Sequence, residues 1–495
     1  MLFNSYTFVL FFLPVVLVGF YVLSRGNERD HAITLLVAAS LFFYGWWNPH
    51  FLALIVGSIT VNFLVGRRMS GAASASWMWA GIAFNLGLLG YFKYANFFAE
   101  VMAQTVGAQW RLPDIVLPLA ISFFTFQQIT YLVDMRHGRV APHRFREYCL
   151  FVTFFPQLIA GPIVHHKEMM PQFSDPGHFR FSWENLGFGL SVFFIGLFKK
   201  VVIADWLSRF ATPVFTAAET GTPIGLIDGW GGALAYTFQL YFDFSGYTDM
   251  ATGLALMFGI RLPMNFYSPY KAVSIIDFWH RWHMTLSRFL RDYLYIPLGG
   301  NRHGRIRRYV NLMATMVLGG LWHGAGWTFI AWGALHGIYL VINNLWRAVT
   351  VRTGITNTGG TTGRWAARTL TFLAVVAAWV LFRAESLDGA ANVFVGMIGG
   401  HGVNPPQVLA EIKWHEVYRI IAFLLAMVWF APNTAQMFRG HAPVLPTERI
   451  LDDDTPQRLS VHWRPAKGWA FILAVVAAAS LANMTEISEF LYFRF

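Results

Sequence analysis

The chain has 495 residues, of which 56% are hydrophobic and 13% are charged. Because a soluble domain usually carries about a quarter charged residues, the composition excludes an ordinary soluble protein. The single cysteine, Cys149, excludes an intrachain disulfide and a cysteine-based metal site. The net charge of +11 does not require a nucleic-acid partner, because Lys and Arg gather in the cytoplasmic loops of membrane proteins. We therefore expect an all-α polytopic membrane protein with about eleven spans and no nucleic acid among its partners.

The N-terminal part alternates apolar runs with basic loops. The first run, 6–23, has no Lys or Arg before it and no cleavage site after it, so we expect a retained span rather than a signal peptide. Four more spans are predicted at 32–46, 51–66, 77–92 and 114–133. Basic residues follow the first, third and fifth spans, which places those loops in the cytoplasm and the N-terminus in the periplasm. Residues 93–113 are expected to lie along the outer surface.

Two segments after the fifth span have a composition unlike the spans. Residues 148–163 are apolar but short and contain Pro156 and Pro162. This predicts a re-entrant or buried segment that lines something central. Residues 164–185 are polar. Their adjacent histidines, His165 and His166, favour a solvated loop over a metal site, because no third ligand is spaced nearby.

Further spans are predicted at 186–204, 229–242 and 247–260. Asp243 and Asp249 lie in or beside the last two of these runs. A carboxylate at membrane depth is costly and usually has a partner. Either these residues orient a histidine, or they cap helix ends, and the sequence leaves both interpretations open.

The region from Arg261 to Arg308 is strongly basic. It contains nine Lys and Arg against Asp277 and Asp292, which places it on the cytoplasmic side. A basic amphipathic segment can rest on anionic lipid, and arginines also bind phosphate-rich ligands such as coenzyme A. Both interpretations stay open, and no arginine is singled out as a donor ligand.

Within this region, residues 275–294 have the periodicity of one amphipathic helix. Its apolar arc contains Trp279 and Leu290, and the charged residues fall outside that arc. His283 does not follow the pattern, because it lies inside the arc. A polar group on a buried face needs a hydrogen-bonding partner or a function.

The run 313–340 is nearly all apolar, and only His323 and His336 interrupt it with ionisable groups. His323 is followed by Gly-Ala-Gly, where the glycines let the backbone bend. An imidazole takes and returns a proton near neutral pH, so His323 is the first candidate for a general base. The alternative is a structural histidine with its hydrogen bonds satisfied in the core. The second misplaced histidine, His283, weakens that alternative.

The C-terminal part returns to apolar runs after a Gly/Thr-rich linker predicted at 350–364. Residues 439–466, which include Asp452 to Asp454, are predicted to form a solvated loop. Spans are predicted at 366–382, 416–431 and 468–483, with a short interfacial segment at 389–399. We expect one integral-membrane domain over 1–495, composed of N-terminal spans (6–134), a catalytic core (148–345) and C-terminal spans (366–495).

Three long runs carry a resemblance to a known family: QLYFDFSGYTDMATGLALMFGIRLPMNF at 239–266, FWHRWHMTLSRFLRDYLYIPLGGNR at 278–302 and GGLWHGAGWTFIAWGALHG at 319–337. With shorter blocks at 117–134, 154–163, 196–205 and 431–438, they resemble the membrane-bound O-acyltransferase family, and more narrowly its alginate O-acetyltransferase branch. The resemblance covers most of the chain. It implies that His323 is the family's essential histidine and that His283 is its second, less uniform one.

The same resemblance implies an O-acetyltransferase of the bacterial inner membrane. Such a protein takes an acetyl group from a cytoplasmic donor, with acetyl-CoA as the expected donor, and passes it across the membrane. The product is an O-acetylated exopolysaccharide, with alginate as the first expectation. The implied partner is a separate periplasmic or extracellular acetyltransferase in a polysaccharide-modification complex, and membrane lipid surrounds the chain. No metal and no permanently bound cofactor are expected.

A transporter or proton-coupled channel is the alternative, because intramembrane histidines and broken helices fit it equally well. Corresponding broken helices in two halves of the chain are not apparent in the sequence, which weakens the inverted-repeat form of this alternative. Turnover of a thioester donor discriminates between the two classes.

Overall fold

The computed structural model describes most of the chain, and every statement below concerns residues 1–25, 29–69, 74–107, 112–113, 115–140, 143–354, 360–403, 408–409, 414–438, 444–445, 461–484 and 490–491. Within these ranges the regular elements are helices. No strand occurs among them, and one isolated bridge joins Pro263 to Leu445. The prediction of an all-α fold is confirmed.

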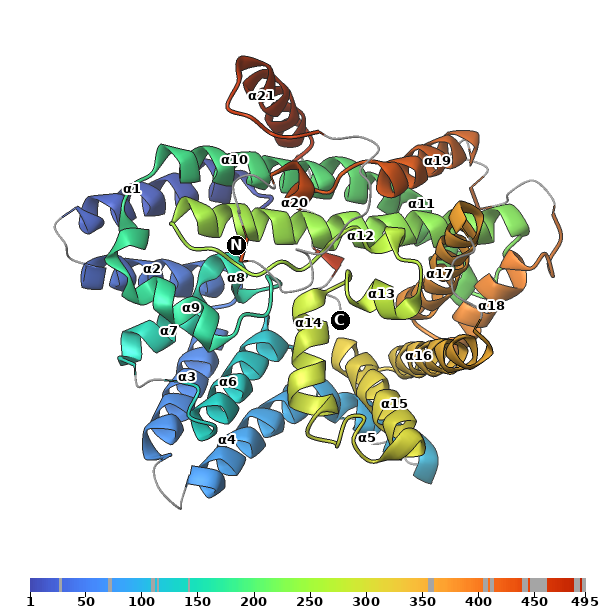
Figure 1. Cartoon of the computed structure of the whole chain (residues 1–495), viewed down its shortest axis with the longest axis horizontal. Helices are drawn as coiled ribbons and strands as arrows, with labels where there is room; N and C mark the ends of the chain where they lie inside the picture. The colour runs from blue at the N-terminus through green and yellow to red at the C-terminus, as the bar shows by residue number, and fades with distance from the viewer. Residues whose placement is uncertain are drawn as a thin grey trace.

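The N-terminal helices occupy the blue and cyan part of Figure 1 and follow the predicted spans closely. Here α1 packs against α2, and α4 packs against α6. In chain order the elements are η1 (Thr7–Phe12), α1 (Leu13–Ser24), α2 (Arg29–Gly45), α3 (His50–Arg68), α4 (Ser74–Leu89), η3 (Gly90–Tyr94), α5 (Ala95–Val106) and α6 (Ile121–Arg136).

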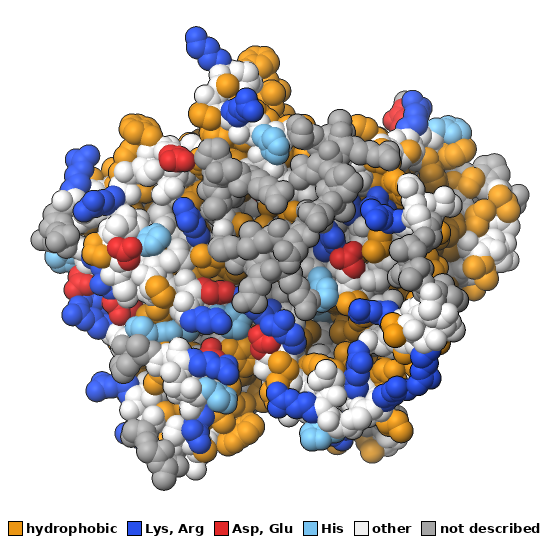
Figure 2. All heavy atoms as spheres, in the orientation of Figure 1, with side chains coloured by type: hydrophobic (Ala, Val, Ile, Leu, Met, Phe, Trp, Pro, Cys, Tyr) orange, Lys and Arg blue, Asp and Glu red, His pale blue; other side chains and the backbone are white. Residues whose placement is uncertain are grey.

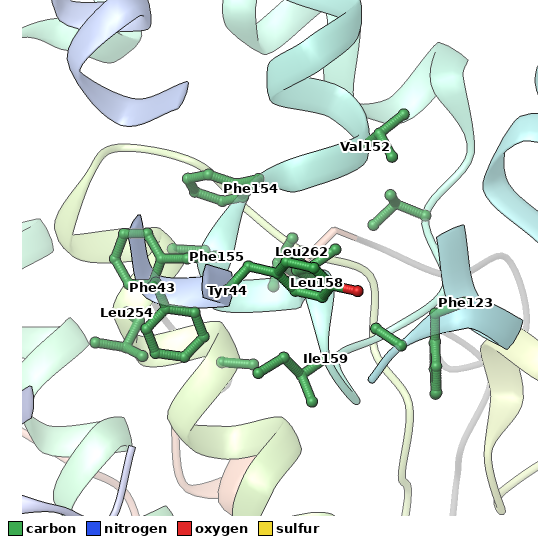
Figure 3. Packing of buried hydrophobic residues seen from close by; sticks show 14 of the residues in the cluster. Phe43, Tyr44, Phe123, Val152, Phe154, Phe155, Leu158, Ile159, Leu254 and Leu262 are labelled. Carbon is green, nitrogen blue, oxygen red and sulfur yellow. The ribbon is translucent and has the colours of Figure 1, made fainter. Parts of the chain in front are cut away.

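The segment 148–163 is irregular and buried, as predicted. It runs through α7 (Phe145–Thr153) and the short α8 (Phe155–Leu158) into a buried turn. Figure 3 shows Phe154, Phe155 and Leu158 packed among aromatic and aliphatic side chains of other elements, and none of the three is more than 1% exposed. The backbone finds polar partners, because the Phe155 N–H donates to Ser40 Oγ (3.1 Å). Whether this segment lines a conduit stays a prediction.

The middle of the molecule is organised by α12 (Leu226–Met257), a helix of 32 residues. It runs beside α10 (Trp183–Phe198) across the upper part of Figure 1. Between these two helices in the sequence lie η5 (Lys199–Ala204) and α11 (Asp205–Glu219), and before them lie α9 (His166–Ser174) and η4 (Pro176–Phe179).

The prediction of two spans, at 229–242 and 247–260, is wrong, because α12 continues through Gly246. This glycine serves close packing rather than a turn. A Cβ at Gly246 would lie 2.7 Å from the carbonyl oxygen of Gly196 on α10, and a Cβ at Gly253 would lie 2.5 Å from that of Gly189. The two backbones therefore approach each other through glycines, which a helix tolerates when packing compensates for its cost.

The single helix predicted over 275–294 is broken into two pieces. The first is α13 (Ile275–Trp279), preceded by η6 (Pro269–Lys271), and the second is α14 (Met284–Leu290), which continues directly into η7 (Arg291–Tyr295). Tertiary hydrogen bonds explain the break. The Tyr267 N–H donates to the carbonyl of Arg281 (2.9 Å), and the Met284 N–H donates to the carbonyl of Asn265 (3.0 Å). The extended segment that contains Asn265 and Tyr267 thus hydrogen-bonds to backbone groups of Arg281 and Met284, which a continuous helix would have used within itself.

The apolar run 313–340 is also two helices, α15 (Gly304–His323) and α16 (Trp327–Thr353), which pack against each other. The remaining elements are α17 (Gly360–Arg383), α18 (Leu387–Met397), α19 (Trp414–Phe430), α20 (Thr434–Met437) and α21 (Lys467–Ala482). The two ends of the predicted linker 350–364 are helical, and its centre lies outside the described residues. Asp452 to Asp454, in the predicted solvated loop, also lie outside the described residues.

Five helical segments of the described chain are long and apolar enough to cross a membrane: Thr7–Ser24, His50–Arg68, Trp183–Glu219, Trp327–Thr353 and Gly360–Arg383. This criterion rests on length and composition alone. Several expected spans are shorter or more polar than it requires, so the count of about eleven spans is not confirmed and stays a prediction.

Candidate functional site

His323 is the last residue of α15. The helix ends there because Gly324 and Gly326 adopt extended conformations before α16 begins. The ring of Phe329 fills the space beside Gly324, where an added Cβ would lie 2.1 Å from it. The predicted bend at the two glycines is therefore present, and it places the imidazole at a helix end rather than in the middle of a span.

Aromatic rings surround the His323 side chain, which leaves the residue 6% exposed. Its ring centroid lies 4.8 Å from that of Trp322, 5.1 Å from Trp332 and 5.1 Å from Phe382. The rings come from α15, α16 and α17, so side chains of three helices surround one imidazole. Such an environment excludes bulk water and strengthens any electrostatic interaction made inside it.

His283 lies in the break between α13 and α14 and is fully buried. Its backbone is left-handed, with φ at +41°, a conformation that is uncommon for residues other than glycine and that often occurs at functional sites. Its Nδ1 lies 3.1 Å from Oδ1 of Asn265. The prediction that His283 is buried is confirmed. The continuous helix predicted around it is wrong, because a residue in such a helix would not have a positive φ.

The partners of Asn265 fix the tautomer of His283. Its Oδ1 also accepts the Thr285 N–H (3.3 Å) and the Thr285 hydroxyl (2.9 Å). Because this atom already accepts two hydrogen bonds, it is the amide oxygen, and His283 Nδ1 must donate a proton to it. The Nε2 atom of His283 then carries a lone pair.

Trp322 connects the two histidines, with its ring centroid 4.8 Å from His323 and 6.3 Å from His283. The structure therefore brings both sequence-predicted site residues to one aromatic cluster. A third histidine, His336, also packs against Trp332, with centroids 4.8 Å apart. His336 is fully buried, and neither of its ring nitrogens has a hydrogen-bond partner among the described residues.

Asp243 and Asp249 lie in the middle of α12 and cap no helix end. Asp243 forms an ion pair with Lys200 (2.7 Å), and Asp249 forms one with Lys199 (2.5 Å). The Thr434 hydroxyl also donates to Asp249 (2.7 Å). Both carboxylates thus neutralise lysines instead of contacting a histidine, so neither predicted role is found.

Comparison with known proteins identifies the family. Residues 138–382, which include both histidines, match the membrane-bound O-acyltransferase family. A peptidoglycan O-acetyltransferase of Helicobacter pylori is 45% identical over 434 residues, or 82% of this chain and 81% of that protein. A probable alginate O-acetylase AlgI of Pseudomonas putida is 38% identical over 507 residues, which cover 100% of both chains. The chain belongs to the membrane-bound O-acyltransferase family. It is an acyltransferase, and the family resemblance seen in its sequence is confirmed.

A further relative aligns over about half of the chain. A teichoic acid D-alanyltransferase of Streptococcus thermophilus is 31% identical over 236 residues, which are 46% of this chain and 57% of that protein. The transferred groups in these names differ, yet each is an acyl group. The comparisons thus favour an acyltransferase and give no support to the transporter alternative.

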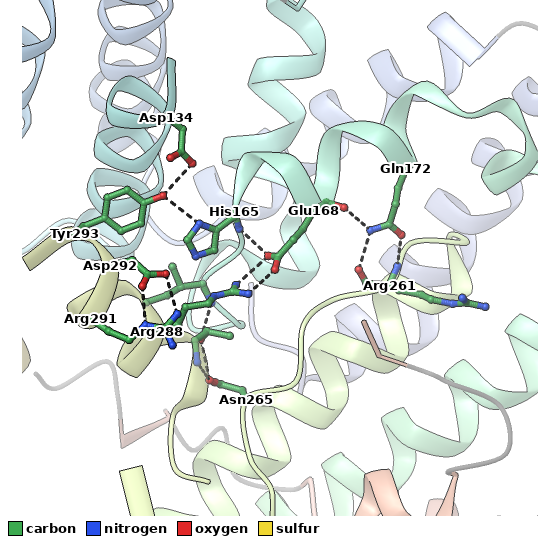
Figure 4. A network of polar contacts seen from close by, with 12 residues as sticks. Asp134, His165, Glu168, Gln172, Arg261, Asn265, Arg288, Arg291, Asp292 and Tyr293 are labelled. Atoms are coloured by element: carbon green, nitrogen blue, oxygen red, sulfur yellow. Dashed lines mark hydrogen bonds and ion pairs between the residues drawn. The ribbon is translucent and has the colours of Figure 1, made fainter. Parts of the chain in front are cut away.

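A polar network that the sequence did not predict joins α6, α9, α14 and η7 (Figure 4). The Tyr293 hydroxyl donates to Asp134 (2.9 Å) and accepts from Nδ1 of His165 (3.2 Å). His165 lies outside the membrane-spanning helices, and burial together with the Arg288 guanidinium lowers its pKa to about 3. The lowered pKa favours the neutral ring at physiological pH, and the hydrogen bond to Tyr293 places its proton on Nδ1.

The solvated loop predicted around His165 and His166 is wrong, because the two residues are 4% and 2% exposed. Arg288 holds this segment with two bonds to Glu168 (2.5 and 3.0 Å). The described residues contain no group of three His, Cys, Asp or Glu side chains arranged for a metal.

Several arginines of the basic region are already engaged by carboxylates. Arg281 pairs with Asp277 (2.7 Å), Arg291 pairs with Asp292 (2.6 Å) and Arg288 pairs with Glu168. In contrast, Arg305 and Arg307, at the start of α15, are exposed. Figure 2 shows Lys and Arg side chains spread over one face of the molecule and outnumbering Asp and Glu there.

Proposed function

We propose that this protein transfers an acetyl group from a cytoplasmic thioester, acetyl-CoA, across the bacterial inner membrane for O-acetylation of an exopolysaccharide. The observation that carries the proposal is the pairing of His323 and His283 around Trp322 at broken helix ends. The names of the aligned relatives support an acetyl group and a polysaccharide acceptor. Alignment over the full length favours alginate as the polysaccharide that finally receives the acetyl group. The relative at 45% identity makes peptidoglycan the second candidate.

His323 is the general base in this proposal. Its neutral imidazole removes the proton of the acceptor hydroxyl while the hydroxyl oxygen attacks the thioester carbonyl carbon. The carbon–sulfur bond then breaks, and the leaving thiolate takes the proton back from the imidazolium. His323 ends the cycle in its starting form, and no oxidant, metal or further reactant is needed for the balance.

His283 supports the same step by orientation. Because its Nδ1–H is committed to Asn265 (3.1 Å), its Nε2 can accept a hydrogen bond but cannot donate one. This favours a role in holding the acceptor through a donor other than the reacting hydroxyl, whose single proton goes to His323. It disfavours a role in stabilising the negative charge that develops on the carbonyl oxygen. Holding reacting groups in place accounts for much of the rate enhancement in transfer reactions.

The topology proposed with this function places the N-terminus in the periplasm and the basic region 261–308 in the cytoplasm. About eleven helices cross the membrane in this arrangement. The basic face in Figure 2 is the expected side for a phosphate-bearing donor. The final transfer onto the polysaccharide is made by a separate periplasmic or extracellular acetyltransferase bound to the same complex.

Inverted membrane vesicles test the donor and the reaction class together. Vesicles with the wild-type chain should release coenzyme A from radiolabelled acetyl-CoA and retain labelled acetate in an alkali-labile product. Vesicles with His323→Ala at the same protein level should release background amounts. If wild-type vesicles consume no acetyl-CoA while the parent cells acetylate their polysaccharide, the assigned donor is wrong. If neither cells nor vesicles acetylate anything, the transferase proposal fails.

A further inference from the structure

A lysine outside the two histidine segments reaches the helix end that carries His323. Lys93 lies in η3, the π-helical turn that follows α4, and is partly buried. Its Nζ donates to the carbonyl oxygen of Trp322 (2.5 Å) and to that of His323 (3.1 Å). The same ammonium lies 5.9 Å from the centroid of the Trp322 ring. Lys93 therefore contacts the backbone of the proposed base and the face of the ring between the two histidines.

The Lys93 contact provides hydrogen-bond donors for the backbone carbonyls at the C-terminal end of α15. The last carbonyls of a helix have no partner within the helix, and α15 ends abruptly because Gly324 is extended. Tyr94 supplies a third donor, since its hydroxyl bonds the carbonyl of Leu321 (2.9 Å). Three successive carbonyls at this helix end are thus held from η3. A cation is also favourable there, because the C-terminal end of a helix carries partial negative charge.

A structural cap alone does not require a lysine. Taking an ammonium out of water is costly, and an uncharged donor such as asparagine would satisfy a carbonyl at lower cost. The location is also unexpected from the distribution of charge. Arg67 and Arg68 lie in the last turn of α3, the end that is predicted to be cytoplasmic. Because η3 lies at the opposite end of α4, Lys93 is on the predicted outer side, where positive residues are depleted. A π-helical turn at this point is a further sign, because such turns recur at functional sites.

We propose that Lys93 is a positioning residue for acyl transfer: its ammonium fixes the last turn of α15 and thereby sets the place of the His323 ring beside Trp322. The proposal rests on the proposed role of His323 as the base. It assigns Lys93 no contact with substrate. It requires a positive charge with two donors at this point, and it predicts that a side chain of similar length without charge cannot replace Lys93.

Four variants test the proposal in cells that lack their own copy of the protein. The readout is the initial rate at which alkali-released acetate accumulates on surface polysaccharide, divided by the amount of each variant in the membrane. Lys93→Met keeps the length and apolar stem of the side chain and should lower the rate by about tenfold to a hundredfold, the loss expected for a misplaced catalytic group. Lys93→Arg keeps the charge and two donors and should recover most of the rate.

Tyr94→Phe and His323→Ala complete the set. Tyr94→Phe removes one uncharged hydrogen bond to the same helix turn. It therefore measures the contribution of a hydrogen bond without a charge, and it should lower the rate less than Lys93→Met does. A Lys93→Met rate within about twofold of wild type, or a Lys93→Arg variant as slow as Lys93→Met, overturns the role of Lys93. Equal losses for Tyr94→Phe and Lys93→Met also overturn it, because the charge would then be irrelevant. If His323→Ala keeps its activity, the proposed base fails independently of the Lys93 result.

Discussion

At the residue scale, Asn265 determines which nitrogen of His283 carries the proton. Its Oδ1 binds His283 Nδ1 and both donors of Thr285, and the Thr285 hydroxyl in turn accepts the Ile163 N–H (3.0 Å). One amide oxygen therefore joins, directly or through Thr285, three segments of the chain. Loss of that oxygen would free the imidazole to rotate and would leave buried donors without an acceptor.

We expect Asn265→Leu to lower acetylation per molecule about tenfold or more, because His283 loses its fixed orientation. Unpaired buried donors should also destabilise the protein by about 1–3 kcal/mol. Asn85→Leu is the matched control, since Asn85 is equally buried but pairs with Asn62 (2.6 Å) between α3 and α4. Acetate release and thermal unfolding in detergent measure the two effects. Equal loss of activity per molecule in both variants would contradict the positioning role of Asn265.

The sequence predicted His283 and His323 because each is a polar residue inside an apolar pattern. Asn265 and Lys93 could not be found in this way. Asn265 follows α12 in an extended segment without periodicity, and its importance arises from contacts with residues about twenty positions later. Lys93 was expected on the outer surface, and its contacts join positions 229 and 230 residues apart. Local sequence carries no signal for such pairs.

At the element scale, the close approach of α15 and α16 sets the position of His323. A Cβ at Gly320 would lie 2.2 Å from the carbonyl oxygen of Phe329, and a Cβ at Gly333 would lie 2.4 Å from that of Met316. These contacts are backbone contacts, so a side chain at either position cannot be accommodated by rotation of a neighbour. The two helices would have to separate.

Gly320→Ala should therefore destabilise the protein by about 1–3 kcal/mol, as overpacking does in other cores, and should lower acetylation by moving the end of α15. Gly319→Ala is the neighbouring control. Its added Cβ would meet only the Leu290 side chain at 3.3 Å, which can shift by a small amount. Thermal unfolding and acetate release per molecule should show a larger loss for Gly320→Ala. Similar behaviour of the two variants would show that the helix contact is not critical.

Helix positions were more predictable than helix breaks. Apolar runs located most helices to within a few residues, because hydrophobic length is a local property. The break at His283 was missed because tertiary hydrogen bonds cause it: the Tyr267 N–H donates to Arg281, and the Met284 N–H donates to Asn265. The opposite error occurred at Gly246. A break was predicted between residues 242 and 247, but α12 is continuous there and Gly246 packs closely against α10.

At the scale of the whole molecule, a buried charge cluster joins segments that are far apart in the sequence. Lys200 bonds Asp243 and Asp205, both at 2.7 Å, and its Nζ lies 4.9 Å from the centroid of the Phe490 ring. The Leu491 N–H donates to Asp243 (3.0 Å). The C-terminal segment is thereby attached to α12 and η5 in the interior.

Lys200→Met should destabilise the protein by about 3–5 kcal/mol, because it leaves a buried carboxylate without its cation. Lys199→Met should cost less, since Lys199 and Asp249 are 16% and 19% exposed, compared with 2% and 3% for Lys200 and Asp243. The double variant Lys200→Met/Asp243→Asn should recover part of the loss. Unfolding temperatures of the purified protein in detergent would measure all three. A Lys200→Met protein as stable as wild type would contradict a structural role for the cluster.

The central claim is that His323 acts as a base and is not merely a packed histidine. Its direct test compares His323→Ala with His336→Phe, a change at the neighbouring buried histidine, in cells where both variants reach wild-type levels in the membrane. The account predicts that alkali-released acetate on surface polysaccharide falls to background for His323→Ala and stays near the wild-type amount for His336→Phe. Normal acetylation by His323→Ala would contradict the account and reduce His323 to a structural residue.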